Sequence, residues 1–367
     1  MSLAVSPYRV VDGVVIDAIE RGLTPGAAFE VRTARETLHR GAYGFAEQRP
    51  VRRTVEQGTI WDLASLTKVL CTAPLFLTWF DRGELDLSEP INEYVPGVPP
   101  EVRIADCLSH SSGYPNWRPI YAQHLRALEH WGSTEIRNSV FRSAAQTPLV
   151  GDPGTSYAYS DIGFLLLCAY AERRFGQPLH LLWKQNLPKS ATEGLHWGHP
   201  DAAATENCPV RRRVIKGQVH DLNAACMGGV SSHAGLFGSC EAAARAAAWP
   251  LRNLLGIDHH LESSSVEYFW RYRGAGSHCL GWDTPSAVSS ASELWPANGV
   301  GHLGFTGCSI WIAPSLSLVA VLLSNRVHPE IPGGATPAAA KHPKTREFFQ
   351  FRQSFHRSIL QHHSHRL

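Results

Sequence analysis

The sequence lacks the features that mark several large classes of protein. No apolar run reaches the roughly 18 residues that a transmembrane helix needs. The N-terminus shows no basic patch followed by an apolar stretch, which is the pattern of a secretory signal. The eight cysteines form no C-x-x-C pair and no zinc-ligand spacing. These absences predict a cytoplasmic protein with no membrane span, no disulfide framework, no metal and no other cofactor.

An excess of charge of one sign is also missing. Lys and Arg number 34 and Asp and Glu 32, and the only compact basic cluster is Arg211-Arg212-Arg213. A surface that binds nucleic acid needs a basic patch or stripe, so we predict no nucleic-acid partner. The 44% hydrophobic and 18% charged residues are typical of a soluble globular protein. They indicate no particular oligomeric state.

Several catalytic motifs are absent as well. The chain has no G-x-S-x-G nucleophile elbow, so the α/β-hydrolase arrangement of Ser, His and Asp lacks its main feature. It has no H-E-x-x-H zinc motif and no phosphate-binding P-loop. Three histidines, His110, His220 and His233, are better explained as loop organisers than as metal ligands or bases.

The order of the expected elements indicates the fold class. Apolar periodicity predicts a helix, two strands and a buried helix in the first part of the chain (7–22, 27–33, 36–43 and 65–80). The middle consists of helical pieces broken by Pro and Gly, the clearest of them at 160–174. Strand signals return after residue 215, with a hairpin pattern and a last helix (301–313, 316–325 and 344–361).

This order predicts an α/β fold of the α+β type. The two ends of the chain can form one antiparallel β-sheet flanked by helices, and the middle then becomes an inserted all-helical lobe. We therefore expect an α/β domain from residues 1–80 and 215–367, and a helical domain from residues 81–214. A substrate is expected in a cleft between the two lobes.

The segment 61–68 (WDLASLTK) carries the strongest chemical signal. A serine hydroxyl becomes a good nucleophile only when another group removes its proton. Positions i and i+3 share one face of a helix, so Lys68 can place its amine beside the Ser65 hydroxyl. Lys68 is the only lysine before Lys184, and a lysine in an apolar helix is costly unless it is paired or functional. An S-x-x-K pattern alone still occurs by chance.

Two further segments each allow two interpretations. In residues 153–161 (PGTSYAYSD), Tyr159 near a lysine ammonium can act as a general base. Alternatively, Ser160 or Asp161 only caps the following helix. In residues 301–307 (GHLGFTG), glycines on a strand either let a substrate approach the backbone or mark a bulge.

Taken in order, these motifs resemble the class C β-lactamase-like serine hydrolases. That family includes β-lactamases, D,D-carboxypeptidases, D-aminopeptidases, esterases and some acyltransferases. Ser65-x-x-Lys68 matches its first motif, Tyr159-Ser160-Asp161 stands at its Y-x-N or Y-S-D motif, and His302-Leu303-Gly304 stands at its K-T-G or H-x-G motif. The resemblance extends over about residues 10–330.

The resemblance implies a role for each matched residue. Ser65 would be the acylated nucleophile, Lys68 its partner, and Tyr159 the base that later protonates the leaving group. The backbone N–H groups of Ser65 and Phe305 would form the oxyanion hole, and His302 and Gly304 would lie beside the substrate. A competing alignment places Phe305-Thr306-Gly307 on the third motif and moves the second N–H donor to Cys308.

Two positions depart from the family pattern. Asp161 replaces the more usual Asn, and a carboxylate near Lys68 would favour the charged ammonium. Lys68 would then be a cation that lowers the pKa of Tyr159, and Tyr159 would be the stronger base candidate. His302-Leu303 replaces Lys-Thr, which in the family help to bind a substrate carboxylate. The second departure argues against a dedicated β-lactamase.

These inferences predict a serine hydrolase that acts through a Ser65 acyl-enzyme on a small ester, amide or peptide substrate. Alternatives are a D,D-carboxypeptidase, a D-aminopeptidase, a β-lactamase, an acyltransferase, and a non-catalytic binding module on the same scaffold. Retention of Ser65, Lys68 and Tyr159 together argues against the last of these.

Overall fold

A six-stranded antiparallel β-sheet forms the centre of the computed structural model, which describes residues 7–286, 289–331 and 342–363. The strand order is β3-β2-β1-β11-β10-β9. The strands come from both ends of the chain: β1 (Gly26–Thr33), β2 (Thr37–Glu47), β3 (Arg53–Thr54), β9 (Val300–Leu303), β10 (Ser309–Ala313) and β11 (Leu318–Ser324). Pairing of β1 with β11 joins the two ends, with Ala27 opposite Ser324. The predicted α+β class with one antiparallel sheet is confirmed.

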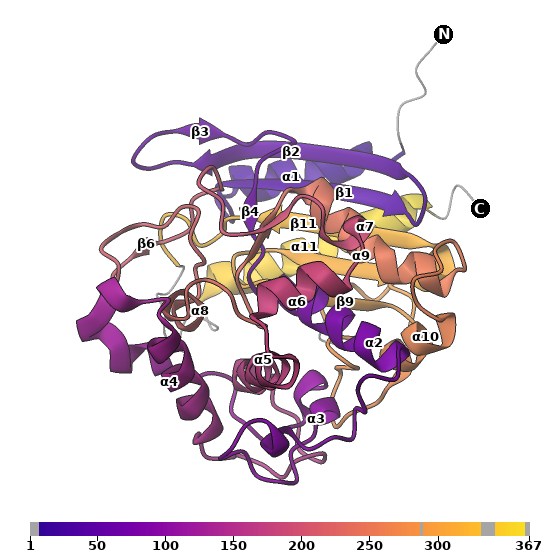
Figure 1. Cartoon of the computed structure of the whole chain (residues 1–367). Coiled ribbons are helices and arrows are strands. Elements are labelled where there is room, and N and C mark those ends of the chain that lie inside the picture. The colour runs from indigo at the N-terminus through magenta and orange to yellow at the C-terminus, as the bar shows by residue number, and fades with distance from the viewer. Residues whose placement is uncertain (1–6, 287–288, 332–341, 364–367) are drawn as a thin grey trace.

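Helices cover both faces of this sheet (Figure 1). Helices α1 (Arg9–Glu20) and α11 (Pro343–His363) pack together on one face, and α9 (Cys240–Leu254) packs on the other. Successive side chains of a strand point to opposite faces. In β11 one set of alternate residues therefore packs toward α1 and α11 (Leu318, Ala320, Leu322), and the other set joins the main core (Val319, Val321, Leu323).

Helices predominate over strands between residues 81 and 214, but the expectation of an all-helical segment is wrong, because three short strands (Leu195–Trp197, Asn207–Cys208 and Arg213–Val214) lie in it and pair with other strands. Its helices are α3 (Ile104–Leu108), α4 (Thr134–Ala145), α5 (Asp161–Phe175), α6 (Leu179–Asn186) and α7 (Lys189–Thr192), with 3-10 turns at Ile91–Glu93 and Ile120–His130. Almost every residue of α5 from Ile162 to Ala171 is buried, because neighbouring elements surround this helix.

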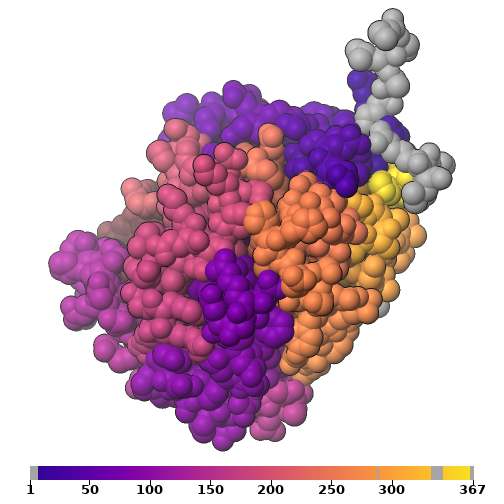
Figure 2. Space-filling model, turned by 45° about the vertical axis from the view of Figure 1, so that its right-hand side comes forward, coloured from indigo at the N-terminus to yellow at the C-terminus, as the bar shows by residue number. Residues whose placement is uncertain are grey.

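The middle segment also packs against the rest of the chain. Helix α6 contacts α2 (Ala73–Asp81), and α7 contacts α9. Strand β5 (Leu195–Trp197) pairs with β8 (Leu236–Gly238), which pairs with β4 (Trp61–Asp62). In Figure 2 a purple segment from the first third of the chain lies between the pink middle segment and the orange one. The division into two domains stays a prediction.

The remaining elements are short. They are the paired strands β6 (Asn207–Cys208) and β7 (Arg213–Val214), the helices α8 (Leu222–Cys226) and α10 (Ser263–Arg271), and a 3-10 turn (Pro314–Leu316) between β10 and β11. Strands β10 and β11 are antiparallel neighbours, with Ala313 opposite Leu318, so the hairpin expected at Pro314-Ser315 is confirmed. The expected strand 301–313 is in fact two strands, because the chain turns back at residues 304–308.

The helical segment after β4 changes its winding around Ser65. Ala64–Leu66 is a 3-10 turn, Lys68–Thr72 is a π-helix, and only α2 is a regular α-helix. Ala64 has a φ of 47°, a left-handed conformation that is uncommon for a residue other than glycine. Local strain and π turns of this kind are concentrated at functional sites.

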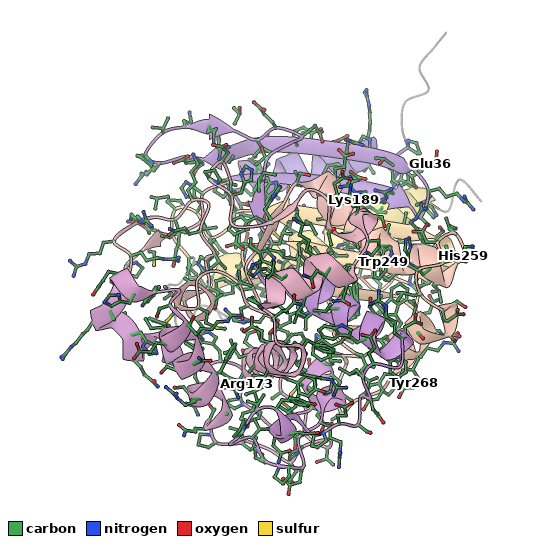
Figure 3. All side chains as sticks on the ribbon, in the orientation of Figure 1. Glu36, Arg173, Lys189, Trp249, His259 and Tyr268 are labelled. Carbon is green, nitrogen blue, oxygen red and sulfur yellow. The ribbon has the colours of Figure 1, made fainter. Side chains whose placement is uncertain are left out.

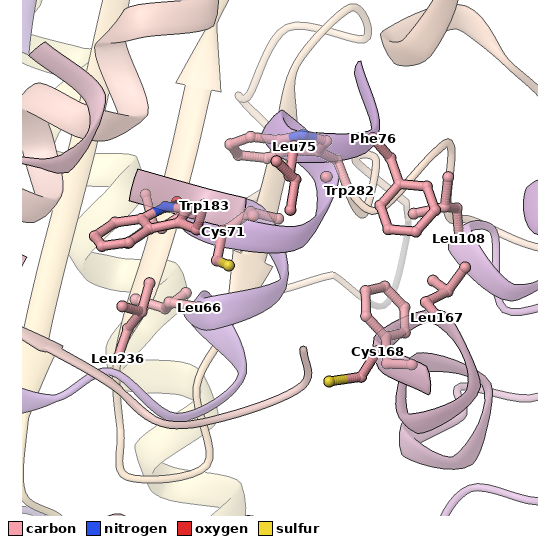
Figure 4. Packing of buried hydrophobic residues seen from close by; sticks show 14 of the residues in the cluster. Leu66, Cys71, Leu75, Phe76, Leu108, Leu167, Cys168, Trp183, Leu236 and Trp282 are labelled. Atoms are coloured by element: carbon pink, nitrogen blue, oxygen red, sulfur yellow. Dashed lines mark hydrogen bonds between the residues drawn. The ribbon is translucent and has the colours of Figure 1, made fainter. Parts of the chain in front are cut away.

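Apolar side chains anchor this segment in the core. Figure 4 shows Leu66, Cys71, Leu75 and Phe76 facing side chains of α5, α6 and nearby segments (Leu167, Cys168, Trp183, Leu236). Trp249 of α9 lies in the interior, whereas Glu36 and His259 lie at the periphery (Figure 3).

All eight cysteines are buried and free. Among the described residues, no helix is both long and apolar enough to span a membrane.

Candidate active site

Lys68 lies at the centre of a group of four side chains. Its Nζ atom donates hydrogen bonds to Ser65 Oγ at 3.0 Å, Tyr159 Oη at 2.8 Å and Asp161 Oδ1 at 2.6 Å. Lys68 is fully buried, whereas Ser65 is partly exposed. The structure therefore brings Ser65, Lys68, Tyr159 and Asp161 together, and we call these residues the lysine group.

The contacts of Lys68 decide its charge. Burial alone would lower the pKa of Lys68, but the Asp161 carboxylate and the Tyr159 hydroxyl raise it overall. An ammonium has three N–H donors, and Ser65, Tyr159 and Asp161 take all three. A charged Lys68 that donates to Ser65 Oγ cannot accept the serine proton. The Asp161 carboxylate thus contacts Lys68, as expected for an Asp at the position where the family usually has Asn.

The pKa of Tyr159 is set by opposing effects. Burial raises the pKa of Tyr159, and the Asp161 carboxylate adds to this effect, while Lys68 lowers it. Lys68 therefore lowers the pKa of Tyr159 as expected, but the net shift is upward, because the loss of hydration outweighs the nearby ammonium. The Ser65 hydroxyl also acts to lower the pKa of Tyr159.

The turn before α5 positions Tyr159 and Asp161. The Ser160 side chain accepts a hydrogen bond from Gly163 N at 3.1 Å, so Ser160 is the N-cap of α5. Its own N–H donates to His110 Nδ1 at 2.9 Å. The capping interpretation is confirmed for Ser160, and its two neighbours contact Lys68, whereas the role of Tyr159 as a base stays a prediction. His110 organises this loop, as the sequence suggested.

The end of β9 lies against the turn that contains Ser65. A Cβ atom on Gly304 would be 2.9 Å from the Leu63 carbonyl oxygen, so only glycine lets the two segments approach this closely. His302 is 2% exposed and points to the interior rather than to solvent. Its Nδ1–H donates to the Leu303 carbonyl at 2.8 Å. His302 and Gly304 thus lie near Ser65, but the His302 ring is not open to solvent.

The backbone N–H groups of Ser65 and Phe305 have no acceptor among the described residues, and the same holds for Thr306 and Cys308 in the turn after Gly304. Phe305 is 49% exposed, whereas Cys308, the alternative donor, is fully buried. A ligand can therefore reach the Phe305 backbone more easily than that of Cys308.

Three histidine rings lie next to the Tyr159 ring. One ring nitrogen each of His110, His278 and His302 lies within 4.8 Å of the other two, and we call these residues the imidazole cluster. The His110 ring centroid is 4.3 Å from that of Tyr159. Burial lowers the pKa of His110 and His302, and that of His278 to about 4, and the nearby Lys68 charge adds to this. All three imidazoles are therefore neutral at pH 7.

Their hydrogen bonds show whether they fit a metal ion. His302 donates from Nδ1, so its Nε2 has a free lone pair. His110 accepts at Nδ1 from Ser160 N–H, so the neutral ring carries its proton on Nε2. A metal-bound histidine donates from its second nitrogen. His110 does not fit a metal ion without giving up the bond that holds the Tyr159 loop. His278 was not predicted, because nothing around it in the sequence marks a site.

Comparison with known proteins gives the family. A model described as Beta-lactamase matches residues 11–343. An N-acetylmuramyl-L-alanine amidase of Bacillus subtilis (strain 168) is 27% identical, with 87% of this chain and 81% of that protein covered. A putative D-alanyl-D-alanine carboxypeptidase of Escherichia coli (strain K12) is 28% identical, with 80% and 76% covered.

Solved structures share the fold at low identity. EstCE1, described as a hydrolase with promiscuous acyltransferase activity, has a TM-score of 0.72 at 17% identity, with 96% of this chain and 98% of that chain covered. The LovD6 mutant of simvastatin synthase from Aspergillus terreus has a TM-score of 0.69 at 17% identity, with both chains covered completely. On the match over nearly its whole length, the chain belongs to the Beta-lactamase family.

Proposed function

We propose that this protein is a serine hydrolase that forms an acyl-enzyme on Ser65 from a small ester or amide substrate. The observation that carries the proposal is the arrangement around Lys68, whose ammonium contacts Ser65 Oγ, Tyr159 Oη and Asp161 Oδ1 together. Holding a nucleophile and a base on one buried cation is a way to activate a serine. Membership of the Beta-lactamase family supports the same chemistry.

In the acylation step, Ser65 Oγ attacks the carbonyl carbon of the substrate and its proton passes to the Tyr159 oxygen. The acceptor is the phenolate form of Tyr159, which burial disfavours and the Lys68 ammonium stabilises, and the phenol that results protonates the leaving group as the carbon–leaving-group bond breaks. Water attacks the ester in the second half, with Tyr159 again taking a proton and returning it to Ser65 Oγ. Lys68 stays charged throughout.

The oxyanion that forms during each attack needs preorganised donors. We assign the N–H groups of Ser65 and Phe305 to this role, because neither has an acceptor among the described residues and both residues are at least partly exposed. The contact of Gly304 with Leu63 supports the assignment, since it holds the Phe305 turn beside the Ser65 turn. It also favours His302-Leu303-Gly304 as the third motif.

The neutral, buried His302 affects which substrates the site favours. It offers no positive charge to a substrate carboxylate, so we favour neutral acyl groups over β-lactams and peptides that end in D-alanine. Relatives named as an amidase and a carboxypeptidase keep amides in the proposal beside esters. A cytoplasmic location is part of this proposal and can be tested by fractionating cells that express the protein.

The test is covalent labelling with a fluorophosphonate, read by mass spectrometry of the intact protein and its peptides. Wild type should gain one adduct on Ser65, and Ser65→Ala should gain none while keeping its thermal unfolding temperature. An adduct of unchanged yield in Ser65→Ala would contradict the proposal.

A second serine provides a matched control. Ser231 Oγ is 2.8 Å from His233 Nδ1, and His233 Nε2 is 2.9 Å from Asp221 Oδ1, so these three side chains are linked as in a catalytic triad. Ser231 is fully buried, however, and a substrate cannot reach it. Ser231→Ala should be labelled at the wild-type rate.

A further inference from the structure

The turn that carries Phe305 is held by a residue from the far end of the chain. Arg352 lies on α11, and its Nη2 atom donates to the Gly304 carbonyl at 2.9 Å and to the Cys308 carbonyl at 2.8 Å. These carbonyls belong to the first and last residues of the turn between β9 and β10. Gly304 N–H also donates to the Cys308 carbonyl at 2.7 Å. One guanidinium therefore ties both ends of the turn together.

Arg352 is a cation without an acidic partner. It is 7% exposed, and among the described residues no carboxylate lies within salt-bridge distance of it. Burial lowers the pKa of Arg352 to about 9, so the guanidinium is charged at neutral pH. Its charged neighbour is a second arginine, Arg326, whose Nε donates to the Phe305 carbonyl at 3.1 Å. Two cations thus bind three carbonyls of one short turn.

A buried charge without a partner costs folding free energy. The same charge is useful near a place where negative charge develops during a reaction, because a low-dielectric interior strengthens its effect. The turn at 304–308 is such a place under the proposed function. An oxyanion donor must also be held at about 2.7–3.1 Å from the oxyanion, which a tied turn can achieve and a loose one cannot.

We propose that Arg352 is a positioning residue that sets the Phe305 N–H for oxyanion stabilisation and supplies positive charge behind it. This inference rests on the proposed function. Under this proposal α11 supports the catalytic site, although this helix lies near the C-terminus and Ser65 lies in the first part of the chain. Arg352 would stabilise the transition state rather than the bound reagent. Its loss should therefore lower the rate of acylation more than it weakens binding of the reagent.

The first experiment separates these two quantities. Fluorophosphonate labelling is measured over a range of reagent concentrations, which gives the maximal labelling rate and the reagent concentration at half-maximal rate. Arg352→Met should lower the maximal rate by about 10- to 100-fold, somewhat less than the loss of a whole oxyanion donor, and change the half-maximal concentration less than about threefold. Arg352→Lys keeps the charge and should stay within about threefold of wild type.

A matched control lies on the same helix. Arg357 is 42% exposed and pairs with Glu293 on the surface, and Arg357→Met should label at the wild-type rate. A wild-type maximal rate in a folded Arg352→Met protein would overturn the proposal. So would an equal loss in Arg357→Met, or a loss confined to the half-maximal concentration.

The second experiment does not depend on catalysis. Amide hydrogen exchange by NMR should show that the Gly304 N–H exchanges at least about tenfold faster in Arg352→Met than in wild type, with no such change in Arg357→Met. Unchanged Gly304 exchange would overturn the role of Arg352 in holding the turn. If wild type is never labelled at Ser65, the proposed function fails, and this exchange measurement still decides whether Arg352 holds the turn.

Discussion

Two buried polar clusters lie next to Tyr159, and they handle charge in opposite ways. The lysine group contains a buried cation, and each N–H of that cation has an acceptor. The imidazole cluster is neutral, and the Nε2 atoms of His110 and His302 have no hydrogen-bond partner in the structure. The lysine group therefore holds a cation and a carboxylate in contact, whereas the imidazole cluster carries no charge of its own and has the Asp283 carboxylate 3.6 Å from His278 Nδ1.

The two clusters should also lose their contributions to the stability of the fold at opposite ends of the pH scale. The pKa of Lys68 is raised above its ordinary value of 10.5, so its contribution to stability is present below that value and is lost as pH rises through the higher folded-state value. The pKa values of the imidazole cluster are lowered below 6.5, so its contribution is present above pH 6.5 and is lost as pH falls toward the folded-state values.

The largest expected effect comes from removing the cation of the lysine group. Lys68→Met should lower the rate of fluorophosphonate labelling by about 10³-fold, because neither the serine nor the phenolate is then stabilised. It should also cost about 3–5 kcal/mol in the free energy of unfolding, since the largely buried Asp161 carboxylate loses its partner. Labelling kinetics and urea unfolding measure the two effects.

A double variant separates these effects. Lys68→Met with Asp161→Asn removes both charges and should recover most of the lost stability without recovering the labelling rate. Lys184→Met, at an exposed lysine on α6, should change neither quantity. Recovery of the rate in the double variant would show that Lys68 acts only by keeping the protein folded.

A smaller effect is expected from the hydroxyl that lies between the two clusters. Tyr159→Phe keeps the ring against the imidazole cluster and removes the base, so the labelling rate should fall by about 10²-fold or more with little change in stability. Tyr157→Phe is the matched control, since the Tyr157 hydroxyl contacts His278 Nδ1 at 2.8 Å and takes no part in the lysine group. An unchanged rate in Tyr159→Phe would return the role of base to Lys68.

The smallest effect concerns the imidazole cluster at acid pH. The pKa of His278 is lowered from 6.5 to about 4, and by linkage this one group should cost wild type about 2 kcal/mol of unfolding free energy between pH 7 and pH 5. His278→Gln should remove that part of the pH dependence. His130→Gln, at a histidine that is 69% exposed, should not change it. Equal slopes in wild type and His278→Gln would contradict a neutral cluster.

The parts of the fold that follow local rules could be predicted from the sequence. Period-2 and period-3.6 patterns indicated β1, β2, β11, α5 and α11 within a few residues. The pairing of the two chain ends followed from the order of strands and helices. The turn at 304–308 was not predicted, because besides its internal hydrogen bonds it depends on Arg352 and on a close contact with Leu63, both distant in sequence.

The same limit applies to the winding around Ser65. The sequence predicted one continuous helix from residue 65, since its apolar pattern does not distinguish an α-helix from a 3-10 or π-helix. The π-helix at Lys68–Thr72 arises where Lys68 must reach Tyr159 and Asp161, which belong to another segment. Tertiary contacts therefore override the local preference at the site.

By itself, the sequence determined the family, the antiparallel sheet shared by the chain ends, and the placement of Ser65 and Lys68 one turn apart. Spacing on a helix is a local property, so residue identity and order were enough. Only the tertiary structure decided the protonation of the site. The charge on Lys68, the raised pKa of Tyr159 and the neutral imidazole cluster all depend on burial and on partners 90 or more residues away. Hydration and charge are set by what surrounds a group in space, which the linear sequence does not specify.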